Sequence, residues 1–169
     1  MRFQKLIPEN NLRGEVVLVD ALNQLFTISA YLLGRPVFLC NDGFLRDAME
    51  LHGKSIGTHL PIRAFELVMA YFVKLECSGM VFYFDRQVNG CLQYYELLAK
   101  KLPDFIMQPE IILSHTVDKD LINQTEGFIA TSDSVIIEKS PLKVFDLAKN
   151  TLEFHFWPEF FDLNKLISR

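Results

Sequence analysis

The chain has 169 residues, half of them hydrophobic, which suits one domain with a sizeable core and excludes an intrinsically disordered protein. Its net charge of −4 gives no general attraction to nucleic acid, so any such binding would need a local basic patch. No apolar run reaches the roughly 18 residues of a membrane span, and three widely spaced cysteines argue against a disulfide framework or a zinc site and fit a reducing cytoplasm.

The chain alternates apolar runs of strand length with stretches of helical period. In chain order the elements are a strand at 15–21, a helix at 21–33 that Gly34 ends, a short strand or hairpin arm at 36–40, a helix at 44–53, a long helix at 61–79, a strand at 80–85, a helix at 91–102, a strand at 110–115, a short helix at 118–123, a strand at 127–131 and a helix that starts near 132. Residues 142–148 fit either an edge strand or part of a helix, and the aromatic tail at 152–167 has no clear pattern.

This alternation predicts an α/β fold with a mostly parallel central sheet and helices on both faces, which is a three-layer α/β/α sandwich. Right-handed crossovers bring the carboxyl ends of parallel strands to one edge of the sheet. Ligands of open α/β sheets bind at that edge, near the point where the strand order reverses. Functional residues are therefore expected just after the strands.

Three apolar runs deliver an aspartate at this place: Asp20 ends VVLVD, Asp85 ends VFYFD, and Asp133 follows GFIATS. Carboxylates that lie close together repel one another, and a hard divalent cation such as Mg²⁺ or Mn²⁺ offsets that repulsion because it prefers oxygen ligands. The alternative interpretation is local, since Asp20 and Asp133 both precede helical patterns and each would serve as a helix N-cap.

The motifs VVLVDALNQL and IATSDSVII resemble the first and last acidic motifs of the PIN-like nuclease superfamily. A closer resemblance is to an uncharacterised archaeal and bacterial PIN-like family. It is carried by Asp20, Asn23, Leu25, Thr27, Ile28, Asp42, Gly43, Arg46, Asp47, His52, Gly53, Asp85, DKDL at 118–121 and ATSDSVIIE at 130–138. The chain departs from that pattern in RQVNG at 86–90, where a serine-rich turn is expected, and at Glu138, where an aspartate is expected.

The resemblance implies a single PIN-like domain over residues 1–169, with its core at about 15–152. It also implies phosphodiester hydrolysis with Mg²⁺ or Mn²⁺ held by Asp20, Asp85 and Asp133. Asp47 is expected as the additional carboxylate that such sites often contain, and Asp120 as a second candidate near the same edge.

Substrate-binding roles are expected for Asn23, Arg46 and Ser132, and each has an alternative. Asn23 would hold water or phosphate, or would hydrogen-bond locally to backbone. Arg46, expected on a helix with Asp47, would bind phosphate or pair with Asp42 four residues earlier. Ser132 or its neighbour Thr131 would cap the following helix and leave Asp133 for metal; Asp118 is expected as the cap of its own short helix.

These expectations favour a metal-dependent ribonuclease that acts on single-stranded RNA. The alternative is a non-catalytic PIN-like module that binds RNA, a phosphate-bearing small molecule or a protein partner. The aromatic stretch around Trp157 fits base stacking, a core lid or a self-association surface such as that of a homodimer.

Overall fold

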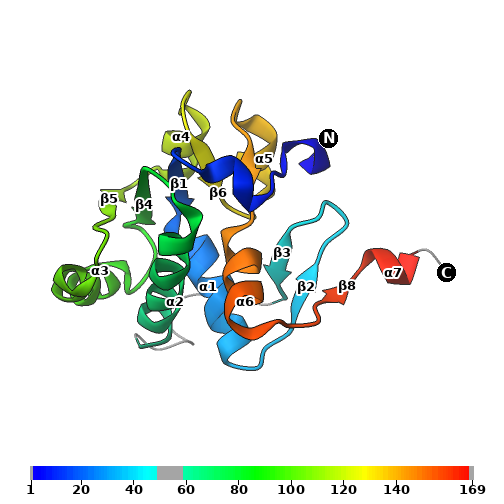
Figure 1. Ribbon diagram of the computed structural model, residues 1–169, viewed down its shortest axis with the longest axis horizontal. Coiled ribbons are helices and arrows are strands. Elements are labelled where there is room, and N and C mark those ends of the chain that lie inside the picture. The colour runs from blue at the N-terminus through cyan, green and yellow to red at the C-terminus, as the bar shows by residue number, and fades with distance from the viewer. Residues whose placement is uncertain (1, 49–58, 168–169) are drawn as a thin grey trace.

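The computed structural model of the protein describes residues 2–48 and 59–167. Its centre is a sheet of five parallel strands with helices on both faces (Figure 1), so the predicted α/β class is confirmed. In sheet order these strands are β5 (Glu110–Ser114), β4 (Gly79–Asp85), β1 (Val16–Asp20), β6 (Phe128–Ala130) and β7 (Val144–Phe145). A smaller sheet has the order β3 (Leu45–Asp47), β2 (Val37–Leu39) and β8 (Phe161–Asp162).

The α-helices that cover the sheets follow the predicted alternation through most of the chain. They are α1 (Ala21–Leu32), α2 (His59–Leu75), α3 (Cys91–Lys101), α4 (Val117–Ile122), α5 (Ser134–Lys139), α6 (Leu147–Phe156) and α7 (Asn164–Ile167). Three 3-10 turns were not predicted: η1 (Arg2–Lys5), η2 (Glu9–Leu12) and η3 (Leu102–Asp104). Within the described ranges, no helix combines the length and the apolar character needed to cross a membrane.

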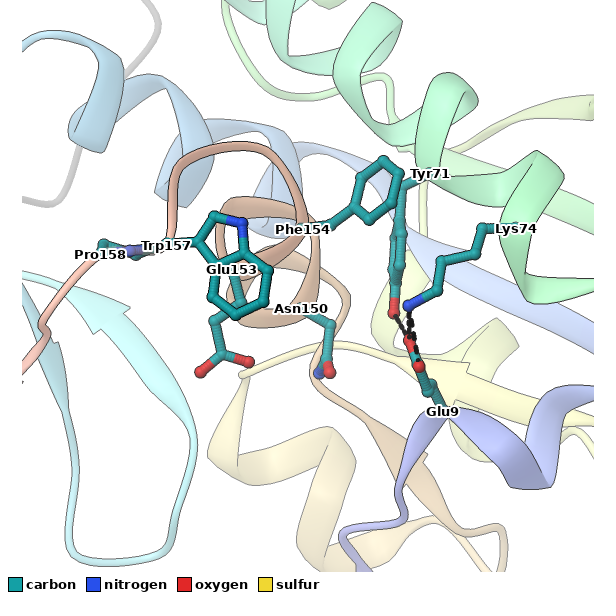
Figure 2. A pocket seen from close by; sticks show the side chains of 8 residues that line it. All are labelled: Glu9, Tyr71, Lys74, Asn150, Glu153, Phe154, Trp157 and Pro158. Carbon is teal, nitrogen blue, oxygen red and sulfur yellow. Dashed lines mark hydrogen bonds and ion pairs between the residues drawn. The ribbon is translucent and has the colours of Figure 1, made fainter.

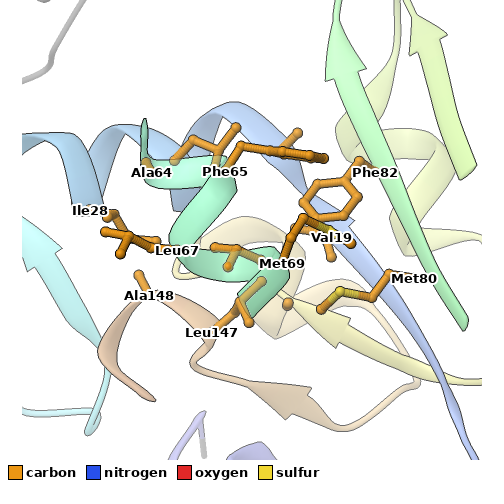
Figure 3. Close-up of a cluster of buried hydrophobic side chains, with 14 of the residues drawn as sticks. Val19, Ile28, Ala64, Phe65, Leu67, Met69, Met80, Phe82, Leu147 and Ala148 are labelled. Carbon is orange, nitrogen blue, oxygen red and sulfur yellow. The ribbon is translucent and has the colours of Figure 1, made fainter. Parts of the chain in front are cut away.

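Alternate side chains of β1 divide the core into two halves. Val17 and Val19 lie in the large cluster shown in part in Figure 3, where they pack with Phe82 of β4 and with side chains of α1, α2, α3 and α6. Leu18 lies in a second cluster with Leu121 of α4 and with α5. A strand buried on both faces needs a continuous apolar run, which is why the run before Asp20 has no polar interruption.

The parallel register brings the carboxyl ends of the strands to one edge of the main sheet, which we call the rim. Asp20 is the last residue of β1 and pairs with Tyr83 of β4; Asp85, two residues beyond Tyr83, ends β4. Thr131 and Asp146 directly follow β6 and β7. The aspartates expected after the strands therefore do lie at one edge.

The helix predicted at 44–53 is wrong where the structure describes it. After a turn in which Gly43 has φ of +83°, the chain forms β3 antiparallel to β2. The amide of Leu45 is bonded by the carboxylate of Asp146, 101 residues away, rather than by a carbonyl within a helix. This long-range bond is invisible to the local pattern, and residues 49–53 of the predicted helix lie outside the described residues.

The structure of the C-terminal region decides between the alternatives left open for residues 142–148 and for the tail at 152–167. Residues 142–148 contain both structures, since β7 ends at Phe145 and α6 begins at Leu147. The unassigned tail continues α6, adds β8 to the smaller sheet and ends in α7. The tail therefore packs as part of the α/β domain rather than as a separate unit.

Gly127, just before β6, offers a test of the close approach between β6 and β1. Its φ is +87°, and a Cβ atom there would lie 2.8 Å from the carbonyl oxygen of Val16. We expect Gly127→Ala to lower the free energy of unfolding by about 2–4 kcal/mol, the sum of the left-handed backbone cost and a backbone clash. Urea unfolding measures this loss.

Gly34 supplies the matched control for that substitution. Its φ is +67°, and no described atom would lie within 4 Å of an added Cβ. Gly34→Ala should therefore cost only the backbone term of about 1–2 kcal/mol. Equal losses for the two variants would contradict the close contact at Gly127.

Candidate functional site

Asp20 is the most deeply buried carboxylate of the three predicted metal ligands. It is 9% exposed and accepts a hydrogen bond of 2.8 Å from the hydroxyl of Thr131. Although it stands at the N-cap position of α1, its side chain makes no capping bond. Burial raises the pKa of Asp20 to about 7; the Thr131 bond opposes this shift, and the charges of Asp118 and Asp133 add to it.

Asp133 has a structural task at the rim. Its Oδ1 accepts hydrogen bonds from the amides of Val135 at 2.7 Å and Ile136 at 3.0 Å, so it is the N-cap of α5. The expectation that Thr131 or Ser132 would be the cap is wrong, because the helix begins directly after Asp133 and aspartate is a strong N-cap. Its charge nevertheless acts on Asp20.

Asp85 interacts electrostatically with Asp118, a residue that was expected only as a helix cap. Burial raises the pKa of Asp118, and the charges of Asp133 and then Asp85 raise it further. The N-cap position of α4 belongs to Thr116, so Asp118 lies in the first turn of that helix. The charges of Asp118 and Asp133 thus act on Asp20, and those of Asp133 and Asp85 act on Asp118, so these four carboxylates lie within electrostatic range of one another at the rim.

Asp120, by contrast, is held within the turn between β5 and α4. Its carboxylate accepts hydrogen bonds from the hydroxyls of Ser114 and Thr116, the latter at 3.1 Å. Residues two apart on a helix point in directions about 200° apart, so Asp120 is bonded at the end of β5 while Asp118 is the one whose pKa is raised by the charge of Asp133. The helical period applied to DKD at 118–120 was the sequence signal that could have assigned the two carboxylates to different surroundings.

Hydrogen bonds between Asn23 and Ser132 join α1 to the turn before α5. The Oδ1 of Asn23 accepts hydrogen bonds from the amide of Ser132 at 2.9 Å and from its hydroxyl at 3.0 Å. Both groups are donors, which fixes the orientation of the Asn23 carboxamide. The Oδ1 of Asn23 also accepts a bond of 2.7 Å from the side chain of Gln24 in the same helix, so Asn23 joins a local contact to one across 109 residues of sequence.

Arg46 lies on β3, not on the predicted helix, and it is already paired. Its two terminal nitrogens donate to both oxygens of Asp42 at 2.8 Å each, and its Nε donates to the carbonyl oxygen of Ser132 at 2.8 Å. The ion-pair alternative for Arg46 is thus realised, in a hairpin instead of a helix. The side chain of Arg46 remains 26% exposed.

A polar hollow of about 410 Å³ lies beside the carboxylates. Among the side chains that line it are Asn23, Arg46, Ser132, Asp133 and Asp47, so it collects several of the residues singled out in the sequence. Asp47 accepts a hydrogen bond of 3.3 Å from Thr27, which also lines the hollow. Because Asp133 belongs both to the hollow and to the carboxylate group, a ligand in the hollow would contact the rim.

Asp146 is a buried carboxylate that the sequence analysis missed. It is 1% exposed, and its oxygens accept bonds from the amides of Leu45 at 2.6 Å and Lys149 at 3.0 Å. Burial raises its pKa to about 6, and the two amide bonds oppose that rise. The run KVFD carries the same signal as the other three strand ends, but Asp146 anchors β3 and caps α6.

The donor chemistry of the rim fits a hard divalent cation, since Asp20, Asp118, Asp133 and Asp85 offer only carboxylate oxygens. Burial is the main cause of the raised pKa values of Asp20 and Asp118, and the charges of the neighbouring aspartates raise them further. Over residues 2–48 and 59–167, no three His, Cys, Asp or Glu side chains converge as a metal-ligand group.

Comparisons with known proteins cover the rim. The model of a family described as "Domain of unknown function (DUF5616)" matches residues 9–150. "Uncharacterized protein MJ0935" from Methanocaldococcus jannaschii is 26% identical over 152 residues, which are 89% of this chain and 72% of that protein. Neither description names an activity, so the resemblance to PIN-like nucleases stays a prediction. The family match includes every rim aspartate from Asp20 to Asp146 and ends before Trp157.

The buried Asp20 predicts a pH dependence of stability in metal-free protein. Its pKa is about 7 in the folded chain against an ordinary 3.8, so the unfolded chain loses the proton first and ionisation favours unfolding. The contribution of protonated Asp20 to the free energy of unfolding is fully present below about pH 4 and is lost as the pH rises through about 7. Asp20→Asn cannot ionise and keeps an acceptor for Thr131, so it should exceed wild type at pH 8 by up to about 4 kcal/mol.

Urea unfolding in EDTA at pH 5 and pH 8 measures this difference, which should shrink at pH 5. Asp146 shifts in the same direction, but it is present in both proteins and cancels in the comparison. Equal stability of wild type and Asp20→Asn at both pH values would show that Asp20 ionises normally.

Proposed function

Since the chain belongs to the family described as "Domain of unknown function (DUF5616)", which names no activity, we propose a function from the rim itself. The protein is a PIN-like, divalent-metal-dependent phosphodiesterase that acts on single-stranded RNA. The observation that carries this proposal is the buried Asp20, whose pKa is raised to about 7 by burial and by the charges of Asp118 and Asp133 beside it. Carboxylates gathered at the ligand-binding edge of a parallel sheet are a costly arrangement that a cation relieves.

The residues that would hold Mg²⁺ or Mn²⁺ are Asp20, Asp118 and Asp133, with Asp85 beside them. Asp118 takes the place that Asp120 had in the sequence-based expectation, because Asp120 is bonded to Ser114 and Thr116. When bound, such a cation supplies Lewis acidity toward a phosphoryl oxygen and lowers the pKa of water. Thr131 orients the Asp20 carboxylate by its hydrogen bond.

The hollow beside the carboxylates provides the substrate contacts. Arg46 offers a positive charge whose orientation is fixed by Asp42, and it lines the hollow together with Asn23 and Ser134. A phosphate bound there lies next to Asp133 and therefore next to the cation site. An open hollow at a sheet edge suits a flexible single strand, which can bend one phosphate inward, better than a stiff duplex.

One observation favours the non-catalytic alternative, a PIN-like module that binds RNA, a phosphate-bearing small molecule or a protein. Arg46 is engaged by Asp42 and by the Ser132 carbonyl, and one oxygen of Asp133 caps α5. Groups committed to such bonds have less capacity left for a reacting phosphate and its metal. Binding without cleavage would then be the whole activity of the rim.

Metal linkage is the first test of this proposal. At pH 8, Mn²⁺ at 100 times its dissociation constant should stabilise the wild type by about 2.7 kcal/mol, because the site exists only in the folded state. Asp118→Asn should abolish the metal-dependent rise in melting temperature. The hydrogen bond that lowers the pKa of Asp118 comes from its own backbone amide, and asparagine keeps an oxygen that can accept it, so the variant removes charge at little structural cost.

Asp120→Asn is the matched control, with the same change of charge two residues away. It should lower the melting temperature of the metal-free protein, because it disturbs the bonds from Ser114 and Thr116, and it should keep the shift with Mn²⁺. The opposite pattern, with the metal shift lost in Asp120→Asn and kept in Asp118→Asn, would contradict the assignment of ligands.

Cleavage is the second test. Wild type with Mn²⁺ should cut single-stranded RNA slowly and EDTA should stop it, whereas Asp133→Asn should be inactive. Asparagine is as good an N-cap as aspartate, so this variant should keep α5 while losing the charge. A gel assay with identically purified wild type, Asp133→Asn and Asp120→Asn measures the rates, and Asp120→Asn should retain activity. RNA that is bound but left intact would make the binding module the better description.

A further inference from the structure

A second hollow, of about 410 Å³, lies far from the rim, where η2 leads into β1 and the last turn of α2 leads toward β4. Figure 2 shows that α6 supplies its other wall. We call it the tryptophan pocket; the side chains used below are Glu9, Tyr71, Lys74, Glu153, Phe154 and Trp157. Its ligand chemistry is independent of the function proposed for the rim.

Trp157 has an unfavourable backbone conformation without the burial that would explain it. It is the C-cap of α6 with φ of +50° and ψ of +49°, a left-handed conformation that favours glycine or asparagine. A bulky residue there is strained, yet the indole is 87% exposed. In this conformation a large aromatic face lies in solvent at the mouth of the pocket (Figure 2).

The other aromatic faces of the pocket already hold a cation. The ammonium group of Lys74 lies 5.7 Å from the ring centre of Tyr71 and 5.4 Å from that of Phe154, which are cation–π distances. Glu9 neutralises this ammonium group, with its two oxygens at 2.9 and 3.1 Å, and also accepts a bond of 2.6 Å from the hydroxyl of Tyr71. The opposite charges of Lys74 and Glu9 cancel, so this pair adds no net charge to the pocket.

Glu153 supplies the remaining charge. Its side chain is 44% exposed, and the nearest cation is the ammonium group of Lys149 at 3.7 Å, beyond hydrogen-bond distance. Within the described residues its carboxylate accepts no hydrogen bond from the protein. The tryptophan pocket therefore combines an exposed indole with a carboxylate whose hydrogen-bonding capacity is unused.

We propose that the tryptophan pocket binds a guanidinium group, which would stack on Trp157 and pair with Glu153. A guanidinium group is planar and weakly hydrated, stacks on aromatic faces and donates two parallel hydrogen bonds to a carboxylate. A nucleotide fits less well, because its phosphate would meet the charge of Glu153 while Lys74 is engaged by Glu9. A free guanidinium compound and an arginine side chain of a partner protein share this chemistry.

Fluorescence gives a direct test, because Trp157 is the single tryptophan of the chain. Blocked arginine (N-acetylarginine methylamide) should change the emission saturably at about millimolar concentration, and its uncharged isostere, N-acetylcitrulline methylamide, should not. Glu153→Gln should weaken binding at least fivefold. Glu96→Gln, an equal change of charge on an exposed residue of α3, should leave it unchanged.

Further titrations distinguish a free guanidinium compound from an arginine side chain and test other classes of ligand. Tighter binding of agmatine than of blocked arginine would indicate a free compound, and the reverse would indicate a protein side chain. Equal responses to arginine and citrulline, no response to either cation, or a response to adenosine monophosphate alone would each overturn the proposal.

Trp157→Gly separates a binding role from a structural one. Glycine relieves the left-handed conformation and little buried surface is lost, so the melting temperature should rise by about 2–4 °C. Calorimetric titration with blocked arginine should show no binding to this variant. Retained affinity in Trp157→Gly would overturn the proposal.

Discussion

The rim depends on one buried hydroxyl, that of Thr131. It donates to the carboxylate of Asp20 and accepts from the amide of Asp133, so a single side chain joins the end of β1 to the start of α5. Thr131 is fully buried, and the parallel pairing of β6 with β1 fixes its position. The next residue, Ser132, extends the same turn to Asn23 and to Arg46. The carboxylates and the polar hollow thus share one support.

Unfavourable negative charge is buried in the same region that Thr131 holds together. Asp20 and Asp146 are both buried with raised pKa values, although they serve different ends. Asp146 is compensated by two backbone amides and anchors β3. Burial raises the pKa of Asp20; the bond from the Thr131 hydroxyl opposes this rise most and the backbone amide of Asn23 least, while the charges of further carboxylates add to it. A buried carboxylate with so little compensation is stabilised far more by a ligand than by the fold, which is why the rim, rather than Asp146, is the functional candidate.

Several features followed from local pattern because their causes are local. The order of strands and helices was predicted because hydrophobic period reflects burial of nearby residues. The positions of Asp20, Asp85 and Asp133 at one sheet edge were predicted because parallel crossovers leave no other arrangement. The helix predicted at 44–53 failed because the hairpin is bonded by the carboxylate of Asp146, the residue just before α6. The expected capping of α5 failed because the helix starts one or two residues later than the pattern suggested.

The sequence by itself determined the α/β class, the burial of β1 from Val17 to Asp20 and the position of the aspartates at the rim. Only the tertiary structure decided which carboxylates act on one another, and it placed Asp118 rather than Asp120 beside Asp133. It also decided that Arg46 is held by Ser132, a contact across 86 residues of sequence. Periodicity records which face of an element is buried, whereas side-chain pairing depends on how distant elements meet, and no stretch of sequence contains both partners.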